Sequence, residues 1–214
     1  MATREVQWFI NHQKDDGLRP DHIDIRNDQT RAMQVRIYRA YQENCDQNGL
    51  VDFAELLLRA HELWLKNPDI LAHYQRRFRH VLVDEFQDTN KVQYDLVRIL
   101  SSHHRNLCVV GDDDQSIYGW RGANVANILG FEKDHPDAQV VKLEQNYRST
   151  QVILDAAAAV IEPNVGRKAK RLWTDQVGGP PVVLTECNDE RAEAETMLSN
   201  LQILRGSERR SFGD

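Results

Sequence analysis

The sequence is poor in cysteine and lacks long apolar runs. Its three cysteines, Cys45, Cys108 and Cys187, are widely separated and odd in number, which argues against a disulfide framework and against a zinc knuckle. No apolar run approaches the roughly 20 residues of a membrane span. The amino terminus lacks the apolar core of a signal peptide. We therefore expect a soluble, cytoplasmic protein with no membrane partner.

Positive charge is not in excess either. The 214 residues include 27 Lys and Arg against 33 Asp and Glu, for a formal net charge of -6. This balance argues against nucleic-acid binding by nonspecific electrostatics alone, but it allows a local basic groove. With 41% hydrophobic residues, the chain is long enough for one large domain or two small ones.

The most informative stretch is HVLVDEFQD at residues 80–88, where a short apolar run ends in the adjacent carboxylates of Asp84 and Glu85. Such a run suits a strand covered on both faces in a parallel sheet. Ligands of these sheets bind beyond the carboxyl ends of the strands. An acid there can hold a magnesium ion on nucleotide phosphates, and its neighbour can orient or deprotonate a water. The pair indicates nucleotide hydrolysis, although ordinary turns and helix caps also contain acidic pairs.

Two more apolar runs end in polar residues. Residues 107–110 precede a Gly-Asp-Asp-Asp-Gln sequence, and residues 140–143 precede Glu144 and its polar neighbours. The three ends are separated by roughly 30 residues each, the length of a strand, helix and strand unit. Helices over 92–103 and 123–131 would make the crossovers. We expect three strands to converge on one polar edge.

The loop at residues 111–122 combines an amide, two aromatic rings and a cation. Gln115 can sense a terminal phosphate. Tyr118 and Trp120 offer faces on which unpaired bases stack, and Arg121 can reach a phosphate, as in single-stranded nucleic-acid channels. The alternative is that the two aromatic side chains are core residues.

A third polar segment, Asn-Tyr-Arg-Ser-Thr, follows at residues 146–150. Arg148 can stabilise charge on a transferred phosphoryl group, and Tyr147 can stack on a purine. The alternative is an ordinary ion pair between Arg148 and a nearby carboxylate.

The chain divides by pattern into three parts. Residues 1–78 show helical periodicity with a polar, turn-rich stretch at 15–29, residues from about 80 alternate strand and helix, and a new unit begins near 168. Helices are expected around residues 33–41, 53–64, 69–78, 150–161 and 189–204, and a strand is expected at 182–185.

Taken together, these segments resemble the superfamily I DNA helicases of the UvrD, Rep and PcrA type. Residues 83–90, VDEFQDTN, look like that family's Walker B motif. Residues 111–123 look like its motif III, and residues 143–150 like its motif IV. The resemblance extends to residues 49–58 and 170–175, so it covers nearly the whole chain.

The resemblance implies an α/β fold. Residues 79–144 would form the carboxyl-terminal part of a first RecA-like ATPase domain, a partial P-loop NTPase core with parallel strands. Residues 1–78 would be an all-helical accessory segment. Residues 145–214 would begin a second, incomplete RecA-like domain.

The resemblance also implies roles at a nucleotide site. By similarity, Asp84 coordinates Mg²⁺ and Glu85 activates the attacking water. Gln115 would report the state of the γ-phosphate of ATP. Tyr147 would stack near the adenine, and Arg148 would act as an arginine finger. The implied cofactors are ATP and Mg²⁺.

DNA contacts follow from the same family. Tyr118, Trp120 and Arg121 would contact single-stranded DNA, and the family moves 3′ to 5′ along one strand. The implied partners are single-stranded DNA, junctions between duplex and single strand, and DNA repair or replication proteins.

The chain departs from the family in one respect, because it contains no Gly-x-x-x-x-Gly-Lys-Ser/Thr sequence. That P-loop cradles phosphates and supplies a Lys and a magnesium ligand. The family's carboxyl-terminal motifs are absent as well. We therefore expect an internal fragment that is inactive alone and whose partial domains either fold marginally, exposing apolar strand edges, or associate with other copies or partners.

Other functions stay open. The chain as it stands can be a nonhydrolysing module that binds DNA or a protein. The clustered carboxylates can instead serve a two-metal nuclease. A metal site at His103 and His104 is disfavoured, because adjacent histidines point in different directions on a helix and no further ligand completes a site.

Overall fold

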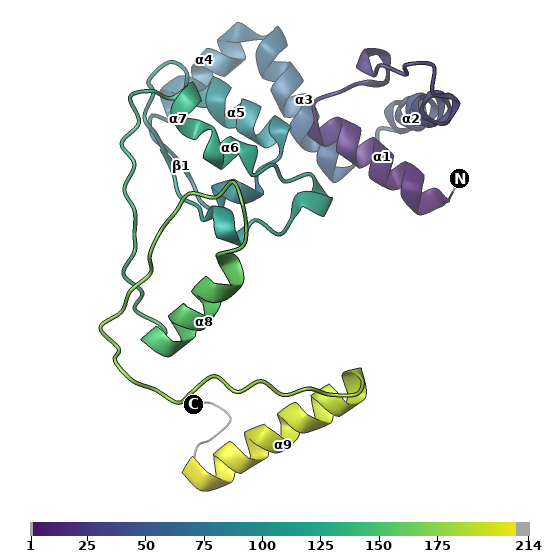
Figure 1. The fold of residues 1–214 in the computed structure, drawn as a ribbon. Helices are drawn as coiled ribbons and strands as arrows, with labels where there is room; N and C mark the ends of the chain where they lie inside the picture. The colour runs from purple at the N-terminus through teal and green to yellow at the C-terminus, as the bar shows by residue number, and fades with distance from the viewer. Residues whose placement is uncertain (1, 209–214) are drawn as a thin grey trace. The chain divides into compact units, whose positions relative to one another are not determined.

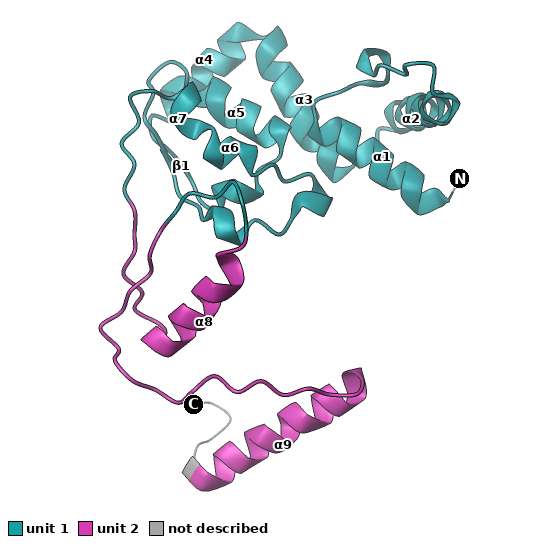
Figure 2. Ribbon diagram, viewed as in Figure 1, with its two compact units in different colours: residues 1–141, 164–169 teal, residues 142–163, 170–214 magenta. Residues whose placement is uncertain are grey.

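The computed structural model describes residues 2–208 and divides into two compact units (Figure 2). Unit 1 comprises residues 1–141 and 164–169, and unit 2 comprises residues 142–163 and 170–214. Within the described residues, none of the helices combines the length and apolar character that crossing a membrane requires. The three-part domain division remains a prediction.

Unit 1 is mainly helical and contains one small sheet (Figure 1). Its elements are α1 (Thr3–Asp15), η1 (Pro20–His22), α2 (Gln29–Gln47), α3 (Phe53–Lys66), α4 (Pro68–Arg77), β1 (Val81–Val83), η2 (Phe86–Asp88), α5 (Lys91–Ser101), β2 (Leu107–Val109), η3 (Asp113–Gln115), η4 (Gly119–Arg121), α6 (Ala126–Leu129) and α7 (Phe131–Asp134). Unit 2 contains α8 (Gln151–Ile161) and α9 (Glu190–Glu208).

The helices of residues 1–78 start at recognisable caps. The Asp28 carboxylate accepts hydrogen bonds from two backbone N–H groups at the start of α2, and Asp52 accepts one at the start of α3. Pro68 occupies the first position of α4, where it costs no backbone hydrogen bond. Gly49, with a φ of 64°, reverses the chain between α2 and α3. The helices predicted at 33–41, 53–64 and 69–78 are therefore confirmed, whereas α1 was not predicted.

The apolar core of the first helices lies between α1 and α2. Phe9 and Ile10 of α1 pack with Ile23, Val35 and Tyr38 in one cluster of buried residues. Tyr38 is fully buried, and its hydroxyl donates to a backbone carbonyl 3.1 Å away, so its polar atom is satisfied. This cluster fixes α1 against α2.

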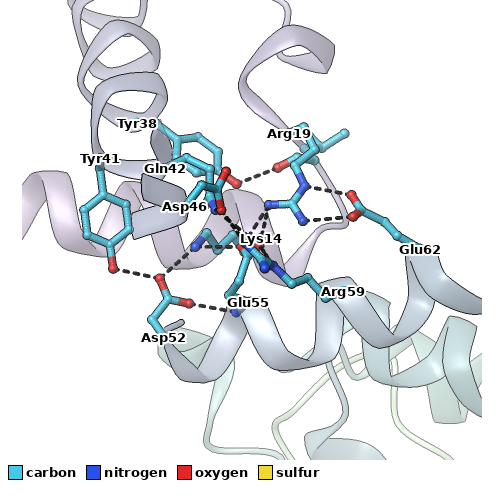
Figure 3. A network of polar contacts seen from close by, with 11 residues as sticks. Lys14, Arg19, Tyr38, Tyr41, Gln42, Asp46, Asp52, Glu55, Arg59 and Glu62 are labelled. Atoms are coloured by element: carbon cyan, nitrogen blue, oxygen red, sulfur yellow. Dashed lines mark hydrogen bonds and ion pairs between the residues drawn. The ribbon is translucent and has the colours of Figure 1, made fainter. Parts of the chain in front are cut away.

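A network of buried charges joins α1 and α3 (Figure 3). Lys14 and Glu55 are each 1% exposed, and the ammonium lies 2.9 Å from a carboxylate oxygen of Glu55 and 2.7 Å from Asp52. Arg19 and Arg59 also donate to Glu55. Burial alone would raise the pKa of Glu55, but the hydrogen bonds from these three cations outweigh it and lower the pKa to about 2. Glu55 is therefore ionised at neutral pH.

The sheet contains two parallel strands, as predicted for the first two apolar runs. β1 pairs with β2 in the register Val81 to Leu107, and α5 makes the crossover between them. Phe86, the first residue of η2, is fully buried and packs edge-on against Tyr94 and Phe131. Parallel pairing brings the carboxyl ends of both strands to one edge. The fold is thus a mixed α/β arrangement with a small parallel sheet.

Three expectations about strands are wrong. Residues 140–143 and 182–185 form no strand, because no neighbouring strand of the described chain supplies hydrogen-bond partners. β1 is not covered on both faces either, since Leu82 is 76% exposed. The crossover expected at 123–131 is two short helices, α6 and α7, which meet at Gly130.

In unit 2, hydrogen bonds join the Asn-Tyr-Arg segment at residues 146–148 to residues 173–176. Gln145 forms an isolated parallel bridge with Trp173. The backbone N–H of Asn146 donates to the Trp173 carbonyl at 2.7 Å, and the Gln176 side chain donates to the Tyr147 carbonyl at 3.0 Å. The helices α8 and α9 confirm the expectations at 150–161 and 189–204.

Candidate functional site

The predicted acids lie where β1 ends. Asp84 and Glu85 are both exposed, and the Asp84 carboxylate accepts a hydrogen bond from the Glu85 backbone N–H at 2.9 Å. Glu85 has φ 50° and ψ 41°, a left-handed conformation that is uncommon for a residue with a side chain. Strained backbone of this kind clusters at functional sites. The tight turn directs the chain into η2 immediately after the two carboxylates.

Gln87 connects Glu85 to the neighbouring strand end. Its side chain is 1% exposed, its amide nitrogen donates to a Glu85 carboxylate oxygen at 2.7 Å, and its amide oxygen accepts the Asp112 backbone N–H at 3.0 Å. The orientation of the amide is fixed, because a backbone N–H can only donate. Gln87 therefore bridges the ends of β1 and β2.

Gly111 allows this bridge to form. A Cβ at position 111 would lie 2.6 Å from the Gln87 amide oxygen and 3.1 Å from the Phe86 backbone nitrogen. A side chain at position 111 would therefore displace the buried Gln87 amide and crowd the Phe86 backbone, so glycine lets the chain after β2 come this close to Gln87.

Gln115 continues the connection on the β2 side. Its side-chain amide donates to an Asp112 carboxylate oxygen at 2.9 Å, and the same carboxylate accepts the Asp114 backbone N–H at 3.0 Å. A continuous hydrogen-bonded path therefore runs from Glu85 through Gln87 and Asp112 to Gln115. Two predicted catalytic residues, Glu85 and Gln115, are thus joined through Asp112, which follows the second apolar run, and through Gln87, which the sequence did not single out.

An open cavity of about 460 Å³ lies beside the acids. It is lined by Val83, Asp84, Glu85, Asp88, Thr89, Gln93, Leu96 and Val97. One carboxylate oxygen of Asp88 is buried, and no described residue hydrogen-bonds to it. Residues 2–208 contain no cluster of three or more His, Cys, Asp or Glu suited to a metal. Proteins commonly hold Mg²⁺ with one or two carboxylates while substrate oxygens and waters complete the shell, and the exposed Asp84 carboxylate and the unpartnered Asp88 oxygen offer such groups.

The aromatic loop is exposed, which contradicts the core alternative. Tyr118 is 39% and Trp120 is 64% exposed. Their ring centroids are 6.4 Å apart, and the Arg121 guanidinium lies 4.6 Å from the Trp120 ring centroid and 5.5 Å from that of Tyr118. The three side chains are brought together by the η4 turn rather than by an extended segment. Flat rings with an adjacent cation suit unpaired bases and their phosphates.

Asp15, the last residue of α1, lies close to this loop at Gly122. Gly122 has a φ of 83°, and a Cβ there would lie 3.2 Å from an Asp15 carboxylate oxygen. Asp15 also accepts a hydrogen bond from the Asn90 side chain at 2.8 Å, and Asn90 caps α5. Burial raises the pKa of Asp15 to about 6, against the opposing effect of His12. Asp15 was not predicted as a contact residue, because its hydrogen-bond partner Asn90 lies 75 residues further along the chain.

Tyr147 and Arg148 belong to unit 2, whereas the two acids at 84–85 belong to unit 1. Tyr147 is 79% exposed, and its hydroxyl donates to the Gln145 side chain at 2.8 Å. The Asn146 carboxamide accepts the backbone N–H groups of Arg148 and Ser149. Arg148 is exposed, and its role in phosphoryl transfer or in an ion pair stays a prediction.

Comparisons with known proteins bear on this arrangement. The model of the UvrD/REP helicase N-terminal domain matches residues 1–136, and that of the UvrD-like helicase C-terminal domain matches residues 141–212. The chain belongs to the UvrD/REP helicase family. The resemblance read from the motifs is therefore confirmed for both segments.

Similar proteins include DNA helicase II of Salmonella typhimurium and of Escherichia coli, 55% and 54% identical over 93% of this chain. The ATP-dependent DNA helicase PcrA of Leuconostoc citreum is 45% identical over 99% of it. The chain spans 28% of the length of each of these three relatives. The activity of these relatives is therefore carried over to this UvrD/REP family chain only as a proposal.

Proposed function

We propose that this chain is part of an ATP-dependent DNA helicase that moves 3′ to 5′ on single-stranded DNA and acts in DNA repair or replication. The observation that carries the proposal is the path from Glu85 through Gln87 and Asp112 to Gln115. It ends five residues before the exposed Trp120. A nucleotide site and a base-stacking loop are thereby joined over a short stretch of chain.

The proposed nucleotide chemistry is carried by three side chains of unit 1. Asp84 would hold Mg²⁺, which when bound with ATP neutralises charge on the phosphate oxygens. Glu85 orients and deprotonates the attacking water, and its position is maintained by the Gln87 amide. Gln115 contacts the terminal phosphate. Since Asp112 accepts a hydrogen bond from Gln115, movement of this amide is transmitted to Gln87 and Glu85.

Two further residues proposed for ATP on the family resemblance, Tyr147 and Arg148, belong to unit 2. Arg148 acts as an arginine finger, and its exposed guanidinium keeps its donors available for phosphate oxygens. Tyr147 stacks near the adenine. These roles correspond to a second RecA-like domain beginning at 145, beside a first one at 79–144 and a helical accessory segment at 1–78.

The proposed DNA site is the exposed loop of Tyr118, Trp120 and Arg121. Stacking on aromatic rings holds unpaired bases without reading their sequence, and each stacked base contributes about 1–3 kcal/mol. Junctions between duplex and single strand are the proposed substrates, repair proteins are the proposed partners, and the cytoplasm is the proposed location.

A second candidate function is a nonhydrolysing module that binds DNA or a protein. The observation that favours it is the lack of a P-loop sequence in these 214 residues. The two functions differ in ATP turnover. Residues 2–208 contain no metal-ligand cluster that would favour the two-metal nuclease.

ATP hydrolysis separates the two candidates. The experiment uses a chimera in which this chain replaces the matching segment of Escherichia coli DNA helicase II, so that the relative supplies the segments this chain does not span. With single-stranded DNA, the chimera should hydrolyse ATP. The variant Glu85→Gln should lose turnover by about a hundredfold or more, because it removes the proposed base, while it still binds ATP and accepts the Gln87 hydrogen bond.

The matched control is Glu43→Gln, an exposed acid of α2 in the same unit. It should leave turnover unchanged. Normal hydrolysis by the Glu85→Gln chimera would remove Glu85 from the role of base. An inactive wild-type chimera that still binds single-stranded DNA would favour the nonhydrolysing module.

A further inference from the structure

A short strap of chain returns to unit 1 between two stretches of unit 2. Residues 164–169 belong to unit 1, whereas residues 142–163 before them and 170–214 after them belong to unit 2 (Figure 2). The strap therefore interrupts the polypeptide that carries α8 on one side and the Trp173 bridge on the other. Its contacts within unit 1 are concentrated on the loop at 112–116 and on α7.

Arg167 holds the strap on that loop. Its Nε and Nη2 atoms donate to the two carboxylate oxygens of Asp114 at 2.7 and 2.6 Å. The side chains of Arg167 and Asp114 are only 24% and 10% exposed. A two-pronged arginine and carboxylate pair fixes direction as well as distance, and partial exclusion of water strengthens it.

Lys168 adds two contacts. Its backbone N–H donates to an Asp113 carboxylate oxygen at 2.8 Å, and its ammonium lies 2.5 Å from Glu132 of α7. The basic residues at 167 and 168 therefore have acidic partners within unit 1. The Arg167 side chain and the Lys168 backbone are thus held by the loop, and the Lys168 ammonium by α7.

The residue held by the strap is adjacent to the proposed phosphate sensor. Asp114 precedes Gln115, and both donate to the Asp112 carboxylate, one by its backbone N–H and the other by its side chain. The backbone N–H groups of Gln115 and Ser116 also donate within this turn. A displacement of Asp114 therefore changes the geometry from which the Gln115 amide projects.

We propose that Arg167 is a positioning residue for ATP hydrolysis: by pairing with Asp114 it holds the 112–116 turn, and with it Gln115, against the strap that connects two parts of unit 2. The proposal rests on the proposed function for the role of Gln115.

The first test measures the turn in the 214-residue chain itself, without nucleotide. Arg167→Gln should speed amide hydrogen exchange at residues 114–116 by about tenfold, because the turn opens more often, and leave α5 unchanged. Combining Arg167→Asp with Asp114→Arg should restore slow exchange by re-forming the pair in reverse. The control is Arg171→Gln, an exposed basic residue four positions further along the chain, which should change nothing. Unaltered exchange in Arg167→Gln, or acceleration across the whole chain, would overturn the clamp.

The second test measures catalysis in the chimera with Escherichia coli DNA helicase II. Arg167→Gln should lower kcat for ATP by about tenfold while KM for ATP and the affinity for single-stranded DNA stay within about twofold, because orientation rather than binding is lost. A weakened, salt-dependent DNA affinity with normal kcat would identify Arg167 as a phosphate contact and overturn the proposal. If Glu85→Gln hydrolyses ATP normally, the proposed function fails, while the exchange experiment still decides whether the clamp exists.

Discussion

Glu85, the proposed general base, has a backbone conformation that is unfavourable for a residue with a side chain. The left-handed conformation costs a residue with a side chain about 1–2 kcal/mol, and here the turn is held by the Asp84 carboxylate and by the buried Gln87 amide. The strain has a functional consequence, because it aims the Glu85 carboxylate at Gln87 and the cavity rather than along the strand. Residues 84–87 thus behave as one positioned unit.

Asp15 gives a test of the contact between α1 and the aromatic loop. Because burial raises its pKa from the ordinary 3.8 to about 6, the folded state binds a proton that the unfolded chain has released between about pH 4 and 6. The contribution of Asp15 to stability therefore falls as pH rises through this window and stays low above it. Asp15→Asn keeps an acceptor for Asn90 and removes the charge.

We expect Asp15→Asn to raise the free energy of unfolding at pH 7.5 by about 1 kcal/mol, a value reduced from the full shift because the group is partly solvated. The difference from wild type should shrink to near zero at pH 4. Urea unfolding of the 214-residue chain at the two pH values measures it. Asp16→Asn is the matched control. An equal effect at both pH values would contradict the raised pKa.

At the residue scale, the sequence identifies candidate functional side chains where residue type and position along the chain are enough to suggest a role. Asp84, Glu85 and Gln115 follow apolar runs, and the aromatic loop is marked by its composition. Gln87 and Arg167 could not be assigned, because their roles come from partners 25 and 53 residues away. Only the folded backbone brings these partners together.

At the scale of elements, helices were more predictable than strands. A helix satisfies its hydrogen bonds within itself, so periodicity and caps such as Asp28 and Asp52 identify it. A strand needs a neighbour. The apolar runs at 140–143 and 182–185 have no neighbour in the described chain, and Leu184 is 96% exposed. The helix α1 was missed because its few apolar residues, Phe9 and Ile10 among them, stand among polar ones.

The charge network between α1 and α3 predicts a large effect on stability. Glu55→Gln removes the carboxylate shared by Lys14, Arg19 and Arg59, and leaves the buried ammonium of Lys14 with Asp52 alone. Breaking a buried ion pair costs about 3–5 kcal/mol. We expect a loss near the lower end, about 3 kcal/mol, because Asp52 remains. Urea unfolding at pH 7 measures it.

The pH dependence provides a second check on Glu55. Because its folded pKa is lowered from 4.5 to about 2, the stabilisation is present above about pH 4.5 and is lost as pH falls toward 2. The difference between wild type and Glu55→Gln should shrink over that range. The control is Asp21→Asn, which breaks the exposed pair with Arg39 and should cost less than about 1 kcal/mol. A similar loss in both variants would contradict the role of burial.

At the scale of the whole molecule, the chain is rich in uncovered apolar surface. Val141, Leu143 and Val183 are between 76% and 80% exposed, and Leu82 leaves one face of the sheet open. Such surface favours association with other segments, partners or further copies. We propose that the isolated chain self-associates; a sedimentation coefficient that stays constant with concentration would contradict this.

We propose that the short loop at residues 111–122 couples ATP hydrolysis to the binding of single-stranded DNA. Its most direct measurement is the ATPase rate of the chimera with and without oligothymidylate, for wild type and Trp120→Ala. We predict that DNA stimulates the wild type, that Trp120→Ala weakens DNA binding by about 1–3 kcal/mol, and that stimulation falls even at saturating DNA. Full stimulation of Trp120→Ala, with unchanged DNA affinity, would contradict the claim.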